Sequence, residues 1–249
     1  MPSLEINQNA FSNDDIYTGL VPPHGSPTLK PLVLTGDELA SAQTHAQSLP
    51  QIRLSSRERG DLIMLGIGGF TPLDGFMGRD DYEGVIDSMT LTKGGVQGDY
   101  AGVFFPIPIT LSTDKATADT LAVGDTVALI DDSGEIMGTL AISDIFTPNK
   151  QAECVATFGT DDPAHVGVAQ VLDSGDVYLG GQVAVFSQGE FPSEYPEIYK
   201  TPAETRALFR QKNWHTISAF QTRNPMHRSH EYLAKIAIEI GDGVLVHSL

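Results

Sequence analysis

The sequence predicts a mixed fold: a β-rich first part followed by a segment of α/β structure. Residues 103–146 hold β-branched and aromatic runs separated by turn residues, which is typical of short strands in a small barrel or sandwich. From Thr201 the order becomes helix, strand, helix, strand with short links, which is typical of a parallel α/β sheet. With 249 residues the chain can form two domains. We place their boundary near residue 171, so that 1–171 is the β-rich domain and 172–249 begins the α/β domain.

Local signals predict the individual elements. Ser55 and Glu58 form a capping box that starts a helix, and Gly66 is a plausible stop. Thr201, Pro202 and Glu204 start a second helix in the same way. The expected strands are Val103–Leu111, Asp125–Asp131, Glu135–Phe146, His215–Phe220 and 244–249. The expected C-terminal helices are 202–212 and 225–240. The second of these has Asn224 as its cap and Pro225 as its first residue.

Composition excludes several classes of protein. Hydrophobic residues make up 41% and charged residues 19% of the chain, which is ordinary for a globular protein. No apolar run approaches the ~20 residues of a membrane span, and residues 1–20 lack the pattern of a signal peptide, so we expect a cytoplasmic protein. Cys154 is the only cysteine and excludes an intramolecular disulfide. The net charge of −17 disfavours nucleic acid as a partner.

The charge is unevenly distributed. Residues 200–235 contain seven basic and two acidic residues and so carry +5, which leaves −22 for the rest of the chain. One interpretation is a basic helix surface that pairs with acidic neighbours. The other is a local field that attracts an anionic substrate. Charge counting alone does not choose between them.

The stretch from Gln221 to Asn224 lies where the predicted strand gives way to the predicted helix. Ligands of open α/β sheets bind beyond the carboxyl ends of the strands, and the first N–H groups of a helix favour anions. Pro225 has no N–H, so Met226 and His227 are the expected free donors. Arg223 adds a planar cation suited to oxyanions. This turn is therefore predicted to bind anions.

His227 and His230 are three residues apart, on one flank of the predicted helix. They could form a zinc pair, but the usual helical pair is four apart and no third ligand is evident. They could also be structural histidines. Together with Arg223 and Asn224, we favour a pair of imidazoles that contact phosphate. The sequence has no GxxxxGK[ST] loop and no GxSxG elbow.

Residues 221–230, "QTRNPMHRSH", resemble the signature of the ATP sulfurylase family, Gln-Thr-Arg-Asn-Pro followed by His-x-x-His. Further blocks resemble the family in its order, and the resemblance covers nearly the whole chain. These blocks are GGFTPLDGFM (68–77), FPIPITL (105–111), FGTDDPAHVGV (158–168), YLGG (178–181) and TPAETR (201–206).

The resemblance implies a PUA-like β-rich N-terminal domain and a nucleotidyltransferase-type, Rossmann-like α/β catalytic domain. It implies the reversible conversion of ATP and sulfate to adenosine 5′-phosphosulfate (APS) and pyrophosphate, with Mg²⁺, in a homo-oligomer. By position, Gln221 and Arg223 would bind sulfate, and Thr222, Arg223 and Asn224 would form the catalytic loop. The residues that would bind ATP are Gln221, Thr222, Arg223, Asn224, His227 and His230.

The family continues beyond the point that corresponds to Leu249, so we expect this chain to be an N-terminal fragment that is inactive alone. Three alternatives remain open. One is another nucleotidyltransferase of the same superfamily, although those usually carry His-x-Gly-His, whereas Arg228 and Ser229 stand here. Another is a PUA-like module that binds RNA without catalysis, although the charge of −22 outside residues 200–235 disfavours it. The third is a chain that lacks its catalytic partner residues and serves only in assembly.

Overall fold

A computed structural model describes residues 19–92 and 101–248 of the chain. Residues 1–18, on which the expectation about the N-terminus rests, and Leu249, the expected end of the last strand, lie outside the described residues. The chain divides into two compact units, one of residues 23–201 and one that joins the described residues before Pro23 to those from Pro202 on, so that the C-terminal division falls between Thr201 and Pro202. This division lies C-terminal to the expected boundary near residue 171, because the strand Val177–Val185 pairs with the strand Ile136–Phe146 in the sheet of the larger unit.

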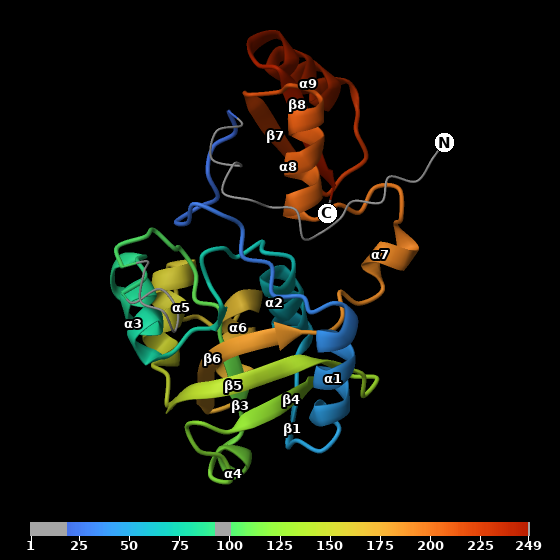
Figure 1. Cartoon of the computed structure of the whole chain (residues 1–249). Coiled ribbons are helices and arrows are strands. Elements are labelled where there is room, and N and C mark those ends of the chain that lie inside the picture. Colours follow the sequence, from blue (N-terminus) through green and yellow to red (C-terminus); the bar gives the residue numbers. More distant parts are fainter. Residues whose placement is uncertain (1–18, 93–100, 249) are drawn as a thin grey trace. The chain divides into compact units, whose positions relative to one another are not determined.

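The larger unit, Pro23–Thr201, holds a mixed set of helices and strands (Figure 1). Its elements are α1 (Gly36–Ala46), β1 (Gln51–Arg53), α2 (Ser56–Gly66), β2 (Gly75–Phe76), α3 (Arg79–Ser88), β3 (Leu111–Thr113), α4 (Lys115–Ala118), β4 (Thr126–Ile130), β5 (Ile136–Phe146), α5 (Lys150–Phe158), α6 (Val166–Asp173), β6 (Val177–Val185) and α7 (Phe191–Glu194). The smaller unit contains α8 (Pro202–Gln211), β7 (Ile217–Thr222), α9 (Arg228–Ile240) and β8 (Gly243–Ser248).

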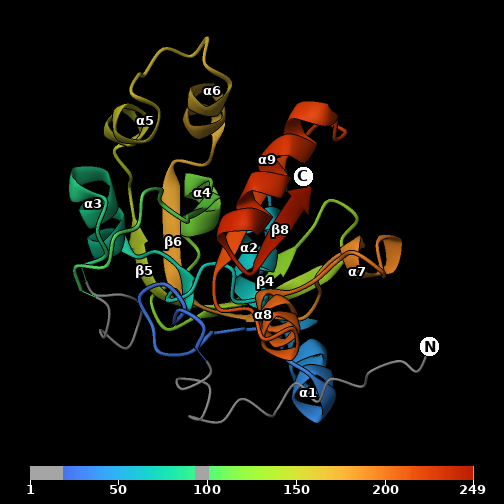
Figure 2. The same ribbon diagram turned by 90° about the horizontal axis from the view of Figure 1, so that it is seen from above.

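The larger unit is built on a six-stranded sheet with the order β1-β4-β5-β6-β2, in which β3 also pairs with β6. Only β1 and β4 run parallel; the other pairs are antiparallel. In Figure 1, β4, β5 and β6 lie side by side, and in Figure 2 the helices α5 and α6 lie next to each other. Residues of β4, β5 and β6 such as Leu129, Leu140 and Leu179 are fully buried and form the centre of the core.

The predictions for this unit are partly confirmed. Strands β4 and β5 lie within the expected ranges, but the strand expected at 103–111 is wrong, since only Leu111 belongs to β3. Pro106 and Pro108 interrupt this run, and proline has no N–H to donate to a neighbouring strand. The structure also adds α1, α3, α5 and α6, which the sequence did not predict.

Helix α2 begins at the predicted capping box, which also connects it to the sheet. The Glu58 side chain is only 2% exposed. Its carboxylate accepts hydrogen bonds from the N–H and Oγ of Ser55 at 2.8 and 2.6 Å. It also accepts from the N–H and Oγ of Ser112 in β3 at 2.7 and 2.8 Å. A buried carboxylate is stable only when it is hydrogen-bonded in this way, so Glu58 both caps α2 and holds it against β3.

Two glycine-rich stretches meet where β2 pairs with β6. Gly75 pairs with Gln182, and Phe76 pairs with Gly181. A Cβ atom placed on Gly180 would lie 2.5 Å from the Cα of Gly78, and a Cβ on Gly75 would overlap the carbonyl oxygen of Gly181. Glycines are therefore required here because the two backbones touch.

The smaller unit contains a parallel pair of strands, β7 and β8, connected by α9. At the turn before β8, the Asp242 carboxylate accepts hydrogen bonds from the N–H groups of Thr216 and His215 at 2.8 and 2.7 Å. These backbone bonds hold the pKa of Asp242 below its usual range, and the bond from Thr216 has the larger effect.

Across residues 202–248, Ala234 is the only buried hydrophobic side chain. In the described part of the chain, no helix is long and apolar enough to cross a membrane.

Candidate functional site

The predicted site lies at the carboxyl ends of two neighbouring parallel strands. Strand β7 ends at Thr222, and residues 223–227 connect it to α9. Strand β8 runs beside β7 in register, with Gln221 opposite His247 and Thr222 opposite Ser248. Because the strands are parallel, their carboxyl ends meet at one edge, which is where α/β proteins bind ligands.

The junction itself is folded differently from the prediction. Helix α9 begins at Arg228, with His227 as its N-cap in extended conformation, and not at Pro225. The Thr222 hydroxyl accepts a hydrogen bond from the Asn224 N–H at 3.1 Å and donates to the Asn224 carbonyl oxygen at 3.0 Å. Both main-chain groups of Asn224 are thus bound by Thr222, and such a local turn competes with the start of a helix.

The two histidines come together at the start of α9. Their ring centroids are 4.0 Å apart, and the rings are inclined by 34°. The His227 N–H donates to Nδ1 of His230 at 3.4 Å, and the Ser229 hydroxyl contacts Nδ1 of His227 at 3.0 Å. Nδ1 of His230 is thus used within the junction, which leaves Nε2 as its other ring nitrogen for a ligand.

The free backbone donors differ from those expected. The N–H of His227 is used by His230, whereas the first helical hydrogen bond runs from the Glu231 N–H to the His227 carbonyl oxygen at 3.0 Å. The N–H groups of Arg228 and Ser229 precede this bond and so lack a partner within the helix. The positive end of α9 is shifted to these residues.

Most of the predicted site residues are accessible to a ligand. Gln221, Arg223, Asn224 and His227 are exposed, while Thr222 and His230 are partly buried. Among the described residues, the Arg223 guanidinium makes no hydrogen bond or ion pair. In the same part of the chain, no group of three or more His, Cys, Asp or Glu side chains could hold a metal ion, so a zinc pair at His227 and His230 lacks further ligands there.

Each interpretation of the basic segment 200–235 holds for part of its charge. Lys235 pairs with Glu231 at 2.7 Å within α9, and Lys212 lies over the ring of Trp214. Arg206 donates to the carbonyl oxygen of Val21 at 2.6 Å. Arg223 and Arg228, at the junction, are exposed. Part of the basic charge is therefore structural, and the part at the junction is available to an anion.

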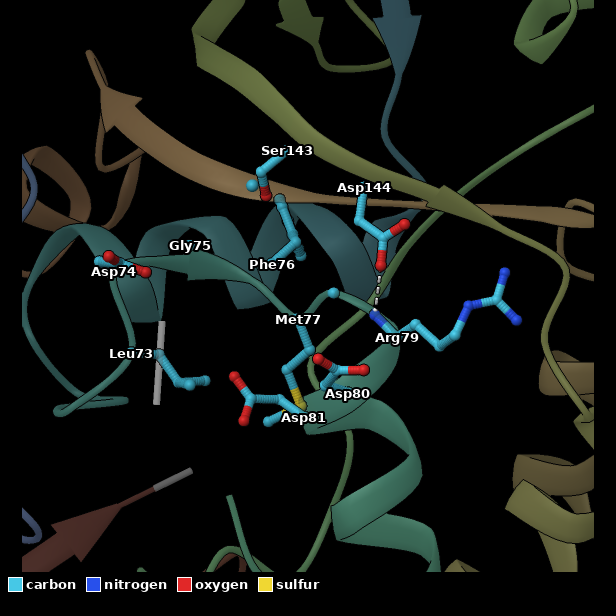
Figure 3. A pocket seen from close by; sticks show the side chains of 12 residues that line it. Leu73, Asp74, Gly75, Phe76, Met77, Arg79, Asp80, Asp81, Ser143 and Asp144 are labelled. Atoms are coloured by element: carbon cyan, nitrogen blue, oxygen red, sulfur yellow. Dashed lines mark hydrogen bonds between the residues drawn. The ribbon is translucent and has the colours of Figure 1, made fainter. Parts of the chain in front are cut away.

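A separate pocket of about 290 Å³ lies in the larger unit and contains none of the predicted site residues. Figure 3 shows Asp74, Asp80, Asp81 and Asp144 around it. Asp144 accepts from the Arg79 N–H at 2.8 Å, and Asp81 accepts from the Thr92 N–H at 2.8 Å. The lining carries four carboxylates against one guanidinium, that of Arg79, and this excess of negative charge repels sulfate and phosphate, so the pocket is unsuited to the anions that the sequence predicts.

Sequence reasoning missed the position of His247. The signal was present, since a polar His interrupts the apolar run VLVHSL. Its meaning depends on the register between β7 and β8, which places it opposite Gln221.

Comparisons with known proteins cover the whole chain. A model of the PUA-like domain matches residues 21–188, and a model of ATP-sulfurylase matches residues 196–249. A sulfate adenylyltransferase of Psychrobacter arcticus is 63% identical over 249 residues, which is 100% of this chain and 57% of the relative. One from Psychrobacter sp. (strain PRwf-1) is 63% identical over 232 residues, with 93% of this chain and 54% of the relative covered. The chain thus spans about half the length of these relatives.

A solved structure is similar as well. The hexameric APS kinase from Thiobacillus denitrificans superposes with a TM-score of 0.70 at 28% sequence identity, and the match covers 92% of this chain and 39% of that one. Both domain models, the high identity to the relatives and the shared fold agree with the signature at the β7–α9 junction. The chain belongs to the ATP sulfurylase family and combines a PUA-like domain with the beginning of the ATP-sulfurylase domain.

Proposed function

We propose that this chain serves the sulfate adenylyltransferase reaction, in which ATP and sulfate give APS and pyrophosphate. The observation that carries the proposal is the β7–α9 junction at the carboxyl edge of a parallel strand pair, where the exposed Arg223 follows β7 and the paired rings of His227 and His230 stand at the start of α9. Relatives that are 63% identical along this chain are sulfate adenylyltransferases. The same site serves both directions of the reaction.

In this proposal, different residues of the junction bind sulfate and the phosphates of ATP. Gln221 and Arg223 bind sulfate. Thr222, Arg223 and Asn224 form the catalytic loop, and Thr222 holds Asn224 in place near the α-phosphate through its two hydrogen bonds. The imidazoles of His227 and His230 contact the other phosphates of ATP, together with the start of α9.

The chemistry suits a site without a general base. Sulfate is fully ionised at neutral pH, so one of its oxygens attacks the α-phosphorus without losing a proton. The new bond joins that oxygen to the α-phosphorus, and the bond from the α-phosphorus to the pyrophosphate oxygen breaks. The electron pair leaves with pyrophosphate. The main barrier is the repulsion between two anions, which positioning and cationic donors reduce.

Mg²⁺ is expected to accompany ATP in this family. The junction offers imidazole, guanidinium and amide groups, whereas Mg²⁺ prefers oxygen ligands, chiefly carboxylates and phosphates. The residues described here therefore do not fit a protein-held Mg²⁺ site. The phosphates of ATP would carry the ion, and we assign no step to it.

We further propose a cytoplasmic homo-oligomer. The hexameric state of the structural neighbour from Thiobacillus denitrificans supports an oligomer. The two-unit organisation supports a PUA-like domain followed by the first part of a catalytic domain.

The test uses a fused protein, in which residues 1–249 precede the part of the Psychrobacter arcticus relative that lies beyond its match to this chain. We expect sulfate-dependent release of pyrophosphate from the fused protein and none from residues 1–249 alone. Without sulfate dependence in the fused protein, the proposed function would be lost. Robust turnover by residues 1–249 alone would refute only the expectation of inactivity.

A single substitution tests how sulfate is selected. A pocket of donors suits sulfate, because hydrogen phosphate brings a proton that finds no acceptor, and an unpaired polar group costs about 1–3 kcal/mol. In the fused protein, Gln221→Glu adds both a negative charge and an acceptor. We expect it to abolish most of the sulfate-dependent turnover; unchanged kinetics would remove Gln221 from the sulfate site.

A further inference from the structure

His247 stands at the carboxyl end of β8, directly beside a proposed sulfate ligand. In the register of the two parallel strands, its Cα is the partner of the Gln221 Cα. Neighbouring strands lie about 4.8 Å apart, and partnered residues of such a pair point to the same face. An imidazole on β8 is therefore within reach of any ligand that the Gln221 amide holds.

The face shared by Gln221 and His247 is distinct from the face next to the start of α9. The ring of Phe220 contacts the ring of His230, with centroids 5.6 Å apart. Because side chains alternate along a strand, Gln221 points away from the Phe220 face, and His247 does the same opposite it. The carboxyl edge of β7 and β8 thus has the His227–His230 pair on one face and the Gln221–His247 pair on the other.

The surroundings of His247 leave its ring accessible. The residue is exposed, and within the described residues it makes no hydrogen bond or ion pair. It follows the apolar residues Val244, Leu245 and Val246 of β8. A polar ring at the end of an apolar strand, without a partner in the unit, is suited to a contact with a ligand.

We propose that His247 is a further sulfate-contacting residue of this site, donating a ring N–H to a sulfate oxygen alongside Gln221. The proposal rests on the function proposed above and adds a residue to it. His247 makes no covalent bond and transfers no proton in the reaction, because sulfate attacks as the dianion. Its contribution is orientation of the anion from the β8 side, opposite the contacts that reach the phosphates.

The test compares two ligands that differ only in the sulfate group. APS carries it, and AMP does not. With the full 249-residue chain, isothermal titration with each nucleotide measures the affinity. For His247→Phe, which keeps a ring but has no N–H to donate, we expect a loss of about threefold to tenfold for APS, as one hydrogen bond is worth about 0.5–1.5 kcal/mol, and no change for AMP.

Controls separate this role from a structural one. His45→Phe makes the same change at an exposed histidine of α1 in the larger unit and should leave both affinities unchanged. In the unsubstituted chain, the NMR signal of the His247 ring should move on addition of APS and stay in place with AMP. Thermal unfolding shows whether the variant is folded.

The outcomes are distinct for the two proposals. Equal losses for APS and AMP, or unchanged APS affinity and an unmoved His247 signal, would overturn the role of His247. The proposed function would survive either result if Arg223→Ala still weakened APS binding. An unsubstituted chain that binds neither nucleotide, combined with a fused protein lacking sulfate-dependent turnover, would overturn both.

Discussion

At the residue scale, the guanidinium of Arg223 is the principal positive charge of the proposed site. It is exposed and without a partner among the described residues, so it can face sulfate and the α-phosphate together. Thr222 fixes the turn that follows it through Asn224. The Arg223 side chain therefore extends from a backbone that is already ordered, which limits the entropy cost of binding a ligand.

The first prediction concerns this charge. In the fused protein, Arg223→Ala is expected to lower turnover on the order of 10²–10³-fold, which is typical for the loss of a charge-stabilising donor. Lys235→Ala is the control, since it removes a basic residue of α9 whose charge already pairs with Glu231, and it should change turnover by less than about threefold. Pyrophosphate release is the measurement. A loss of less than threefold for Arg223→Ala would mean that its role is misassigned.

A second residue, Asp61 in α2, makes stability depend on pH. Burial raises its pKa from 3.8 to about 6, opposed by Arg57 and assisted by Glu58. Its Oδ2 is buried and has no hydrogen-bond partner, and it lies 3.6 Å from Nη1 of Arg57. A raised folded-state pKa favours the protonated form, so its contribution to stability is full below pH 3.8 and is lost as the pH rises through about 6.

Asp61→Asn stays neutral at every pH. We therefore expect the free energy of unfolding of this variant, relative to that of the unsubstituted chain, to be higher at pH 8 than at pH 4. The gain is on the order of 1–3 kcal/mol, because one pKa unit corresponds to about 1.4 kcal/mol. Urea unfolding of both proteins at both pH values measures it. An identical difference at the two pH values would show that Asp61 does not titrate in this range.

At the element scale, the pairing of β2 with β6 and the residue Gly78 that follows β2 bring two backbones so close that no side chain fits between them. Gly180→Ala would force a Cβ within 2.5 Å of the Cα of Gly78, an atom that cannot move without shifting β2. We expect a loss of about 1–3 kcal/mol in the free energy of unfolding, as for other overpacked sites. Denaturant titration is the measurement.

The matched control is Gly60→Ala in the exposed middle of α2, where an added Cβ meets nothing within 4 Å. This change should stabilise the chain by about 0.5–1 kcal/mol, because alanine is the better helix former. If Gly180→Ala were as well tolerated as Gly60→Ala, the close approach of the two backbones would be wrong.

At the scale of the whole molecule, the two units differ in how much they bury. The core residues of β4, β5 and β6 belong to the larger unit, whereas Ala234 alone is a buried hydrophobic residue in 202–248. In α9, Tyr232, Leu233, Ile238 and Ile240 are exposed. Parallel strands are normally covered on both faces, so β7 and β8 lack the packing that stabilises such a sheet.

Hydrogen exchange should report this difference. In the 249-residue chain, we expect the amides of β7 and β8 to exchange at least about tenfold faster than those of β5 and β6, because regions with few buried contacts open more easily. Mass spectrometry of peptides from the four strands measures the rates. Equal protection in both units would show that the smaller unit is stable without further packing.

The sequence by itself determined the features that depend on neighbours along the chain. The capping box of Ser55 and Glu58, the strands β4 and β5, and the strand–turn–helix order around Arg223 are local patterns, and the structure has them all. The signature at 221–230 identified the family for the same reason, since its residues are contiguous.

Tertiary structure decided what depends on contacts between distant residues. Three features join segments that are far apart in sequence. They are the hydrogen bonds from Ser112 to Glu58, the pairing of β6 with β5, which moves the division of the chain to Thr201, and the register that brings His247 beside Gln221. The start of α9 at Arg228 was decided by the side chain of Thr222, which binds the backbone of Asn224. Periodicity and capping preferences do not contain such contacts, because they arise only when the chain is folded.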